Sequence, residues 1–356
     1  MISHKKYMEM ALKLAEKGKG LVSPNPMVGC LIVKRGKIVG RGYHKKFGGP
    51  HAEIEALEQA GKKAQNGTMY VTLEPCSHWG KTPPCTESVV ESGVREVIIG
   101  SKDANPLVEG FKEMKFRGIK TKIGILKEEC DRLNEAYFKY MRTRMPFTIL
   151  KVAMSLDGKI ATSTGDSKYI TSTEARKHVH EIRNEVDAVM VGINTVLRDN
   201  PQLDSRLVNG KDPIKVIVDS HLKIPESSKV LKDPSRVIIA TTNKAPKKKM
   251  DKLHQKGASI IVVKAKKDMV DLKEVMKELG KHDIASVMIE GGSHLNASAI
   301  KEKIVDKVLI FTAPKIIGNG LGAISSLGIT KVDKAVTLKG ISTKKIGKDL
   351  LVEGYL

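Results

Sequence analysis

Two hydrophobic patterns alternate along the chain. Short runs of valine, isoleucine and leucine typical of buried β-strands are separated by stretches in which apolar residues recur every three or four positions, as on one face of a helix. Residues 7–14 show the helical pattern near the N-terminus. Strands are predicted at 28–33, 38–39, 69–73, 96–99 and 120–125, and then at 148–152, 188–191, 214–218, 237–240, 259–263, 286–289 and 307–311. This alternation predicts an α/β protein with largely parallel sheets covered by helices on both faces.

A polar stretch divides the chain. Residues 140–146 are polar and basic and end in Pro146, and a strand-like run follows at once. A length of 356 residues is also typical of two domains. We therefore expect one domain over residues 1–145 and a second over residues 146–356.

The charge balance is strongly basic. The chain has 62 Lys+Arg against 40 Asp+Glu, a formal net charge of +22. Such an excess can indicate a nucleic-acid-binding surface. However, the lysines are spread along the sequence, residues 247–249 form the only dense basic block, and the aromatic residues that stack on bases make up 4%. A lysine-rich solvated surface, with no nucleic-acid partner, is the favoured interpretation.

Membrane and export features are missing from the sequence pattern. No apolar run approaches the roughly 20 residues that span a bilayer, and residues 1–6 lead into a charged amphipathic stretch. Four cysteines are too few for a disulfide scaffold. We expect a cytoplasmic protein with no membrane partner.

The most specific chemistry lies in the first half. His51, Cys76 and Cys85 offer one imidazole and two thiols, and catalytic zinc commonly has three such protein ligands and a water. Glu53 opens a predicted helix and is placed to move a proton from that water to a leaving amine. Pro75 predicts that another helix begins beside Cys76. The pattern H-x-E followed by P-C…C is typical of zinc deaminases of nucleobases and nucleosides.

Two other interpretations use the same residues. His78 could complete a structural zinc site as a fourth ligand, or the cysteines could be buried without metal. The joint occurrence of H-A-E and P-C in a strand–helix context favours the catalytic site. The remaining cysteines, Cys30 and Cys130, are expected in the core.

The spacing of the two cysteine ligands narrows the class. Eight residues separate them within C-S-H-W-G-K-T-P-P-C, where deaminases of RNA or free cytosine usually have two. This insertion resembles the deaminase domain of the bifunctional riboflavin-biosynthesis deaminase/reductases (RibD type). P-N-P-M-V-G-C at 24–30, G-Y-H at 42–44, G-P-H-A-E at 49–53 and D-A-N-P at 103–106 resemble further blocks of that family, with Ala104 in place of a proline.

The resemblance implies a cytidine deaminase-like α/β/α domain that binds Zn²⁺. Its substrate would be 2,5-diamino-6-ribosylamino-4(3H)-pyrimidinone 5′-phosphate, deaminated by hydrolysis with Glu53 as the proton donor. The resemblance also makes Asn25, His44, Lys81 and Thr82 substrate-binding residues, with Lys81 and Thr82 suited to a phosphate.

In the second half, a strand at 286–289, a glycine pair and a helical pattern from His294 suggest an anion site at a helix N-terminus. The glycine pair alone is weak evidence, since it is not a G-x-G-x-x-G fingerprint. K-V-A-M-S-L-D-G-K-I-A at 151–161, G-D-S-K-Y-I-T-S at 165–172 and V-G-I-N-T-V at 191–196 resemble the reductase domain of the same family. Tyr169 stands where that family usually has tryptophan.

This resemblance implies a dihydrofolate reductase-like α/β domain that uses NADPH to reduce the ribosyl group to ribityl. The implied cofactor-binding residues are Ala153, Tyr169, Thr195, Asp199, Ser220, Gly291 and Gly292. The implied substrate-binding residues are Lys151, Ser167, Arg183, Leu203, Arg206 and Glu290.

The sequence therefore predicts a two-domain, two-reaction enzyme of riboflavin biosynthesis. Its partners would be small pyrimidine ribosyl phosphates, and the family suggests a homo-oligomer. Two alternatives remain open: a zinc deaminase acting on RNA, with residues 147–356 as an RNA-binding module, and a zinc-stabilised nucleic-acid-binding protein without catalysis.

Overall fold

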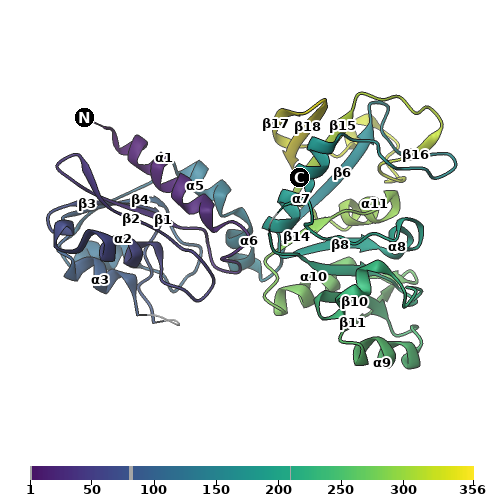
Figure 1. The fold of residues 1–356 in the computed structure, drawn as a ribbon, viewed down its shortest axis with the longest axis horizontal. Helices are drawn as coiled ribbons and strands as arrows, with labels where there is room; N and C mark the ends of the chain where they lie inside the picture. Colours follow the sequence, from purple (N-terminus) through teal and green to yellow (C-terminus); the bar gives the residue numbers. More distant parts are fainter. Residues whose placement is uncertain (1, 80–82, 209) are drawn as a thin grey trace. The chain divides into compact units, whose positions relative to one another are not determined.

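The computed structural model describes residues 2–79, 83–208 and 210–356. The chain divides into two compact units, Met1–Arg144 and Met145–Leu356, each with its own sheet and core (Figure 1). No helix in the described ranges is both long and apolar enough to span a membrane.

The N-terminal unit is a three-layer α/β/α structure. Its helices are α1 (His4–Ala15), α2 (Ala52–Ala60), α3 (Cys85–Glu91), α4 (Gly110–Phe116), α5 (Lys127–Leu133) and α6 (Glu135–Thr143). Its strands are β1 (Gly29–Lys34), β2 (Lys37–Tyr43), β3 (Thr68–Leu73), β4 (Glu96–Ser101) and β5 (Lys120–Ile123), in the order β2-β1-β3-β4-β5. One apolar cluster packs α2, α3 and α4 on one face, and a second packs α1 and α5 on the other.

The sheet of this unit is mixed. The strands β3, β4 and β5 are parallel, as predicted, but β1 pairs antiparallel with both β2 and β3. The β1–β2 hairpin turns at Arg35 and Gly36, whose φ angles of 50° and 76° suit a tight hairpin turn.

Two glycines let α2 lie directly on the sheet. A Cβ added at Gly40 or Gly42 would lie 2.2 or 2.1 Å from the carbonyl oxygens of Ala56 and Ala52 on α2. The bare backbone of β2 therefore fixes how closely the start of α2 approaches the sheet.

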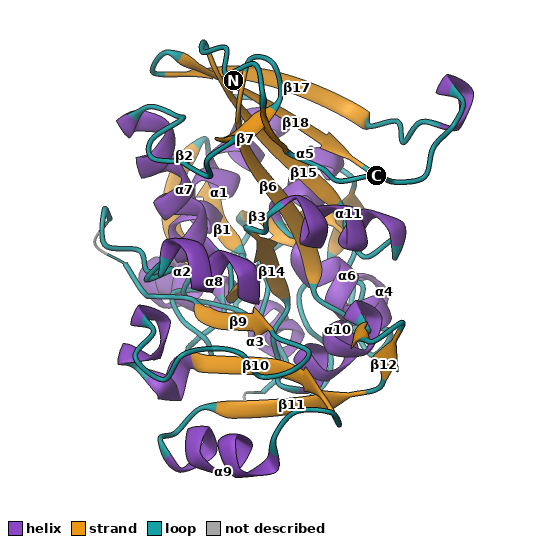
Figure 2. Ribbon diagram, turned by 90° about the vertical axis from the view of Figure 1, so that its right-hand side faces the viewer, coloured by secondary structure: helices purple, strands orange, loops and turns teal. Residues whose placement is uncertain are grey.

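The C-terminal unit is built on one nine-stranded sheet (Figure 2). Its strands are β6 (Phe147–Ser155), β8 (Ala188–Gly192), β9 (Ile214–Val218), β10 (Val237–Thr242), β11 (Ser259–Val263), β14 (Ser286–Ile289), β15 (Lys307–Ala313), β17 (Lys339–Ile346) and β18 (Asp349–Tyr355), in the order β11-β10-β9-β8-β14-β6-β15-β18-β17. The strands from β11 to β15 are parallel, and β18 and β17 add an antiparallel edge.

Helices cover both faces of this sheet. They are α7 (Thr173–Glu185), α8 (Ile193–Asp199), α9 (Lys247–Gln255), α10 (Leu272–Lys281) and α11 (Ser293–Lys301). One apolar cluster contains α10 and α11 residues and the other contains α7, α8 and α9 residues, so the two groups lie on opposite faces. Two short antiparallel pairs, β7 (Lys159–Thr162) with β16 (Gly320–Gly322) and β12 (Ala265–Lys266) with β13 (Met269–Val270), complete the unit.

One prediction about local structure is wrong, and one hairpin was not predicted. No helix begins at Pro75, because residues 74–79 are held outside regular structure by hydrogen bonds from Asp103 and Phe111 backbone N–H groups to the Glu74 carboxylate. The C-terminal hairpin β17–β18 was not predicted, because nearly every residue of β17 is exposed and no buried alternation marks it.

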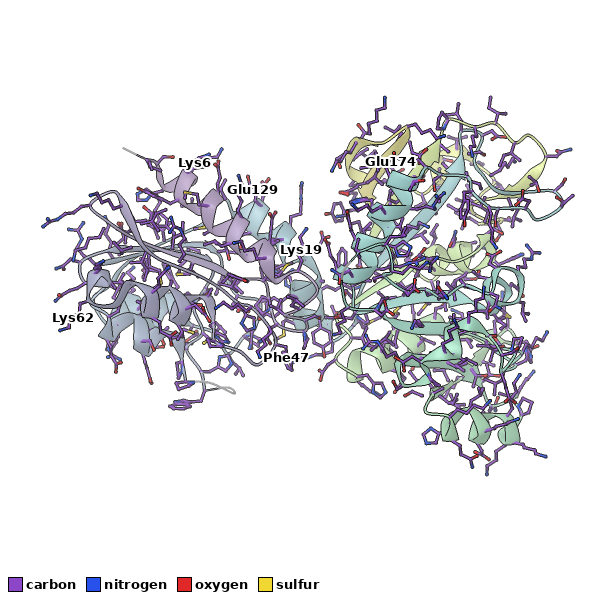
Figure 3. The ribbon with its side chains drawn as sticks, viewed as in Figure 1. Lys6, Lys19, Phe47, Lys62, Glu129 and Glu174 are labelled. Atoms are coloured by element: carbon purple, nitrogen blue, oxygen red, sulfur yellow. The ribbon has the colours of Figure 1, made fainter. Side chains whose placement is uncertain are left out.

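The basic charge lies largely on the surface. Lysines such as Lys6 and Lys62 are exposed and point away from the N-terminal unit (Figure 3).

Cys30 and Cys130 are free and fully buried, as predicted for core residues.

Candidate active sites

Three potential metal ligands meet in the N-terminal unit. His51 is the N-cap residue of α2, Cys76 follows β3, and Cys85 is the first residue of α3. Their ligand atoms all lie within 4.8 Å of one another. The His51 Nδ1 lies 3.1 Å from the Cys85 Sγ and 3.5 Å from the Cys76 Sγ. One imidazole and two thiols at this separation fit a catalytic zinc ion, which leaves a fourth position for water.

The surroundings of the Cys76 thiol favour its ionised form, which is the form that binds a metal ion. Hydrogen bonds from Cys85, first through its side chain, and from His51 lower the pKa of Cys76 to about 4. The Cys85 backbone N–H also donates to the Cys76 Sγ at 3.3 Å. Cys85 opens α3 and therefore lies at the positive end of a helix dipole, which favours its thiolate, whereas Cys76 lies in a loop. His78 is not part of the ligand set that the described residues form.

Glu53 lies in the first turn of α2, two residues beyond His51, and is 3% exposed. Burial raises its pKa to about 7, although the nearby His51 acts in the opposite direction. A carboxyl group with a pKa near neutrality can accept and return a proton at pH 7.

A second pair of predicted residues adjoins the ligand set. The buried His44 ring packs edge-on against His51, with centroids 5.4 Å apart. Its Nδ1–H donates to the Pro50 carbonyl at 2.9 Å, so its Nε2 accepts from the Asn25 amide at 3.1 Å. Burial lowers the pKa of His44, which favours this neutral form. Lys81 and Thr82 lie outside the described residues.

The C-terminal unit contains a cavity of about 350 Å³. It opens beside the carboxyl ends of β6, β8 and β14, where ligands bind in parallel α/β sheets. Its lining includes all the predicted reductase residues except Ser220: Lys151, Ala153, Ser167, Tyr169, Arg183, Thr195, Asp199, Leu203, Arg206, Glu290, Gly291 and Gly292.

A buried charge network forms one wall of this cavity. The Glu290 carboxylate accepts from Arg183 Nε at 2.6 Å and Nη2 at 3.1 Å, and from Lys151 Nζ at 3.2 Å. Burial alone would raise the pKa of Glu290, but the charges of Arg183 and Lys151 outweigh it and lower the pKa to about 2. Glu290 is therefore ionised and fixes two cations at the cavity.

A second cavity of about 290 Å³ shares Ile160, Ser167, Thr195, Asp199 and Gly292 with the first. Apolar residues, among them Val270, form much of its wall. A Cβ added at Gly292, the N-cap residue of α11, would meet only Thr195 Oγ1 at 4.0 Å, so a larger residue would occupy the cavity itself. The glycine pair at this helix N-terminus thus fits the diphosphate of a dinucleotide.

Two predicted cofactor contacts have other partners. The Ser220 hydroxyl accepts from the Val270 backbone N–H at 3.0 Å, and Ser220 lines neither of the two cavities. Tyr169 is 65% exposed, and the Arg176 guanidinium lies 4.0 Å from its ring centroid. One face of the tyrosine ring is therefore already covered.

The cavity lining also includes polar residues that were not predicted, among them Arg176, His180 and Asn296. Arg176, His180 and Arg183 are spaced by four and three positions on α7, and therefore share one helix face. In the sequence, Arg176 and His180 could have been found only by their helical spacing from Arg183, which places them on the same helix face as that arginine.

The fold and the two sites define a two-domain enzyme, a zinc-dependent deaminase joined to an NADPH-dependent reductase. Residues 1–101 match the cytidine and deoxycytidylate deaminase zinc-binding region, and residues 146–352 match the RibD C-terminal domain. The chain belongs to the RibD family of bifunctional riboflavin-biosynthesis enzymes.

Relatives match over nearly the whole chain. The riboflavin biosynthesis protein RibD of Aquifex aeolicus is 44% identical over 98% of this chain and 97% of its own length. Among solved structures, Acinetobacter baumannii RibD has a TM-score of 0.91 at 34% identity, and a deaminase/reductase from Thermotoga maritima has 0.89 at 38%, each covering 99% of this chain and 98% of the other. These matches do not favour the alternative of an RNA deaminase.

Proposed function

We propose that residues 1–145 deaminate 2,5-diamino-6-ribosylamino-4(3H)-pyrimidinone 5′-phosphate and that residues 146–356 reduce the ribosyl chain of the product to ribityl. The Thermotoga maritima relative is described as a diaminohydroxyphosphoribosylaminopyrimidine deaminase/5-amino-6-(5-phosphoribosylamino)uracil reductase. The observation that carries the proposal is the presence in one chain of the His51, Cys76 and Cys85 set and the Glu290-centred cavity.

In the deaminase reaction, His51, Cys76 and Cys85 would hold zinc. Bound zinc supplies a water molecule of lowered pKa. Glu53 would take a proton from the attacking water and give it to the departing amine, which its raised pKa permits. Asn25 and His44 would position the pyrimidine beside the ligands, since the bond between them fixes which hydrogen-bonding atoms remain available.

In the reductase reaction, bound NADPH supplies the hydride. Gly291 and Gly292 would receive its diphosphate at the start of α11, and Thr195 and Asp199 line both cavities. Lys151 and Arg183, both held by Glu290, would orient the sugar phosphate for hydride transfer. Ser167, Leu203 and Arg206 complete the proposed substrate contacts.

Incubation of the full chain with the pyrimidine substrate, followed by mass analysis, tests both reactions. We expect exchange of one amino group for oxygen without NADPH, and a further gain of two hydrogens with NADPH. Deamination without the hydrogen gain would contradict the proposed reductase, and no change at all would contradict both proposals.

We also propose that the enzyme acts in the cytoplasm as a homo-oligomer, with no nucleic-acid partner. The small number of cysteines supports the first point, the resemblance to the family suggests the second, and the dispersed lysines support the third. Light scattering of the purified chain should give a molecular mass that is a multiple of 39.0 kDa. Addition of RNA should not change this mass.

A further inference from the structure

His180 occupies an unusual place in the reductase cavity. It lies on α7, three residues before Arg183, and its side chain lines the cavity although the residue is only 6% exposed. Its Nδ1 is buried, and none of the described residues hydrogen-bonds to it. A buried ring nitrogen without a partner costs free energy. Because the His180 side chain lines the cavity, a ligand bound there is the available partner for the ring.

A second histidine on the same helix shows the contrast. His178 Nδ1 pairs with Glu181 at 2.8 Å, and His178 does not line the cavity. The two rings are two residues apart on one helix, yet of these two only the His180 ring has no hydrogen-bond partner at Nδ1 among the described residues.

The surroundings of His180 are rich in positive charge. Burial, followed by the charges of Arg183 and Arg206, lowers the pKa of His180 to about 4, while Asp204 and Glu290 oppose this shift. The cavity lining also carries the charged groups of Lys151, Arg176 and Asp199. A neutral imidazole near guanidinium groups offers one N–H donor, and an anion beside it would favour the protonated form with two donors.

We propose that His180 is a further substrate-binding residue of the reductase, which forms with Arg183 and Arg206 the subsite for the phosphate monoester of the substrate. Guanidinium groups suit phosphate oxygens. Arg183 already donates from Nε and Nη2 to Glu290 and from Nη1 to the Asp204 carbonyl. Arg206 Nη1 donates to the Asp204 carboxylate, so the phosphate would take the remaining N–H groups of the two arginines. The proposal rests on the sugar-phosphate substrate proposed above. NADPH also carries a phosphate monoester, but the second cavity, whose lining holds the cations Arg198 and Lys266, could receive that group. The lining of this second cavity does not include His180, Arg183 or Arg206.

The test compares H180Q and H180L with the matched control H178Q, all in the full chain. For H180L we expect the reductase KM to rise about tenfold, the loss expected for one hydrogen bond to a charged group. H180Q should show a smaller rise in KM because its amide group keeps one hydrogen-bond donor. H178Q should show no rise in KM. In both His180 variants we expect kcat to change less than about twofold, since the phosphate lies away from the reacting carbon.

A dephosphorylated substrate distinguishes a phosphate-binding role of His180 from a merely structural role. All four proteins should reduce it with the same KM, whereas a merely structural role of His180 would raise KM for both substrates. D-ribose 5-phosphate should inhibit the wild-type reductase more strongly than H180L, and D-ribose should inhibit neither.

Three results would overturn the inference. The first is an unchanged KM in both His180 variants, and the second is an equal rise with the dephosphorylated substrate. The third is weaker NADPH binding, measured by fluorescence titration, with an unchanged substrate KM, because it would assign the ring to the phosphate of the cofactor. If H180L does not fold, H180Q gives the answer, since a KM equal to that of wild type contradicts the proposal. Failure of the wild-type chain to reduce the substrate would instead contradict the proposed function.

Discussion

The two sites of this chain are built in different ways. In the N-terminal unit, three ligand atoms lie within 4.8 Å, on two helix starts and the loop after β3. In the C-terminal unit, the cavity draws its residues from β6, α7, α8 and the turn after β14, across about 140 positions from Lys151 to Glu290. A metal ion requires donors that converge on one point, whereas an extended substrate and cofactor require contacts spread over a surface.

This difference predicts how each site fails. The deaminase site depends on a few atoms, and loss of one should abolish the reaction. The reductase site combines many contacts, and most single changes should weaken binding by moderate factors.

Removal of zinc gives the largest expected effect. Dialysis against a strong chelator should reduce ammonia release below detection, since water without the metal is a poor nucleophile at neutral pH. Reduction of the deaminated substrate by the same sample should continue at the untreated rate. Ammonia release should return when zinc is added, and metal-independent release would show that the ligand set is not catalytic.

Glu53→Gln is the next largest change. The amide cannot carry a proton, so ammonia release should fall about 10²- to 10⁴-fold, the usual contribution of a general acid–base group. Zinc content, measured by atomic emission, should stay equal to wild type because Glu53 is outside the ligand set. If ammonia release continues unchanged with metal bound, Glu53 does not have the proposed role.

Glu290→Gln tests the reductase side. Because the folded pKa of Glu290 is about 2 and its ordinary value is 4.5, the ionised group stabilises the folded unit at neutral pH. A difference of this size corresponds to about 3 kcal/mol, similar to the cost of breaking a buried ion pair. That contribution is lost as the pH falls from about 4.5 to about 2.

Urea unfolding of both proteins at several pH values measures this effect. We expect the free energy of unfolding of Glu290→Gln to be about 3 kcal/mol lower than wild type at pH 7, and the gap to close at acid pH. Glu181→Gln, which changes a more exposed carboxylate on α7, is the control. A gap that does not depend on pH would show that ionisation of Glu290 is not the cause.

The sequence predicted the core strands more reliably than the edges. The buried parallel strands β8, β9 and β10 appear as mainly apolar runs, with Lys215 inside β9, and the structure confirms them. The β17 strand carries mainly exposed polar residues, and its pairing with β18 cannot be read from local pattern. The helix predicted at Pro75 failed because Glu74 is tied to residues about 30 positions away, a tertiary effect that propensity does not include.

The same contrast holds for the sites. His51, Glu53 and the two cysteines follow a fixed spacing and could be selected from sequence, and the structure brings them together. The residue His180 has no motif of its own, and its unpaired nitrogen is evident only when the cavity around it is known. For Ser220 the resemblance implies a cofactor contact, and this stays a prediction; its hydroxyl accepts a backbone hydrogen bond from Val270.

Tyr169→Trp should have the smallest effect. Arg176 already lies over the tyrosine ring, and a tryptophan would strengthen that cation–π contact by no more than about 1 kcal/mol. We therefore expect NADPH affinity, measured by fluorescence titration, to change less than about fivefold. Arg176→Gln is the informative companion, since it uncovers the ring face without changing the aromatic residue. A change of two orders of magnitude in Tyr169→Trp alone would mean that this one ring dominates cofactor binding, and the reductase site would then depend on single contacts as the deaminase site does.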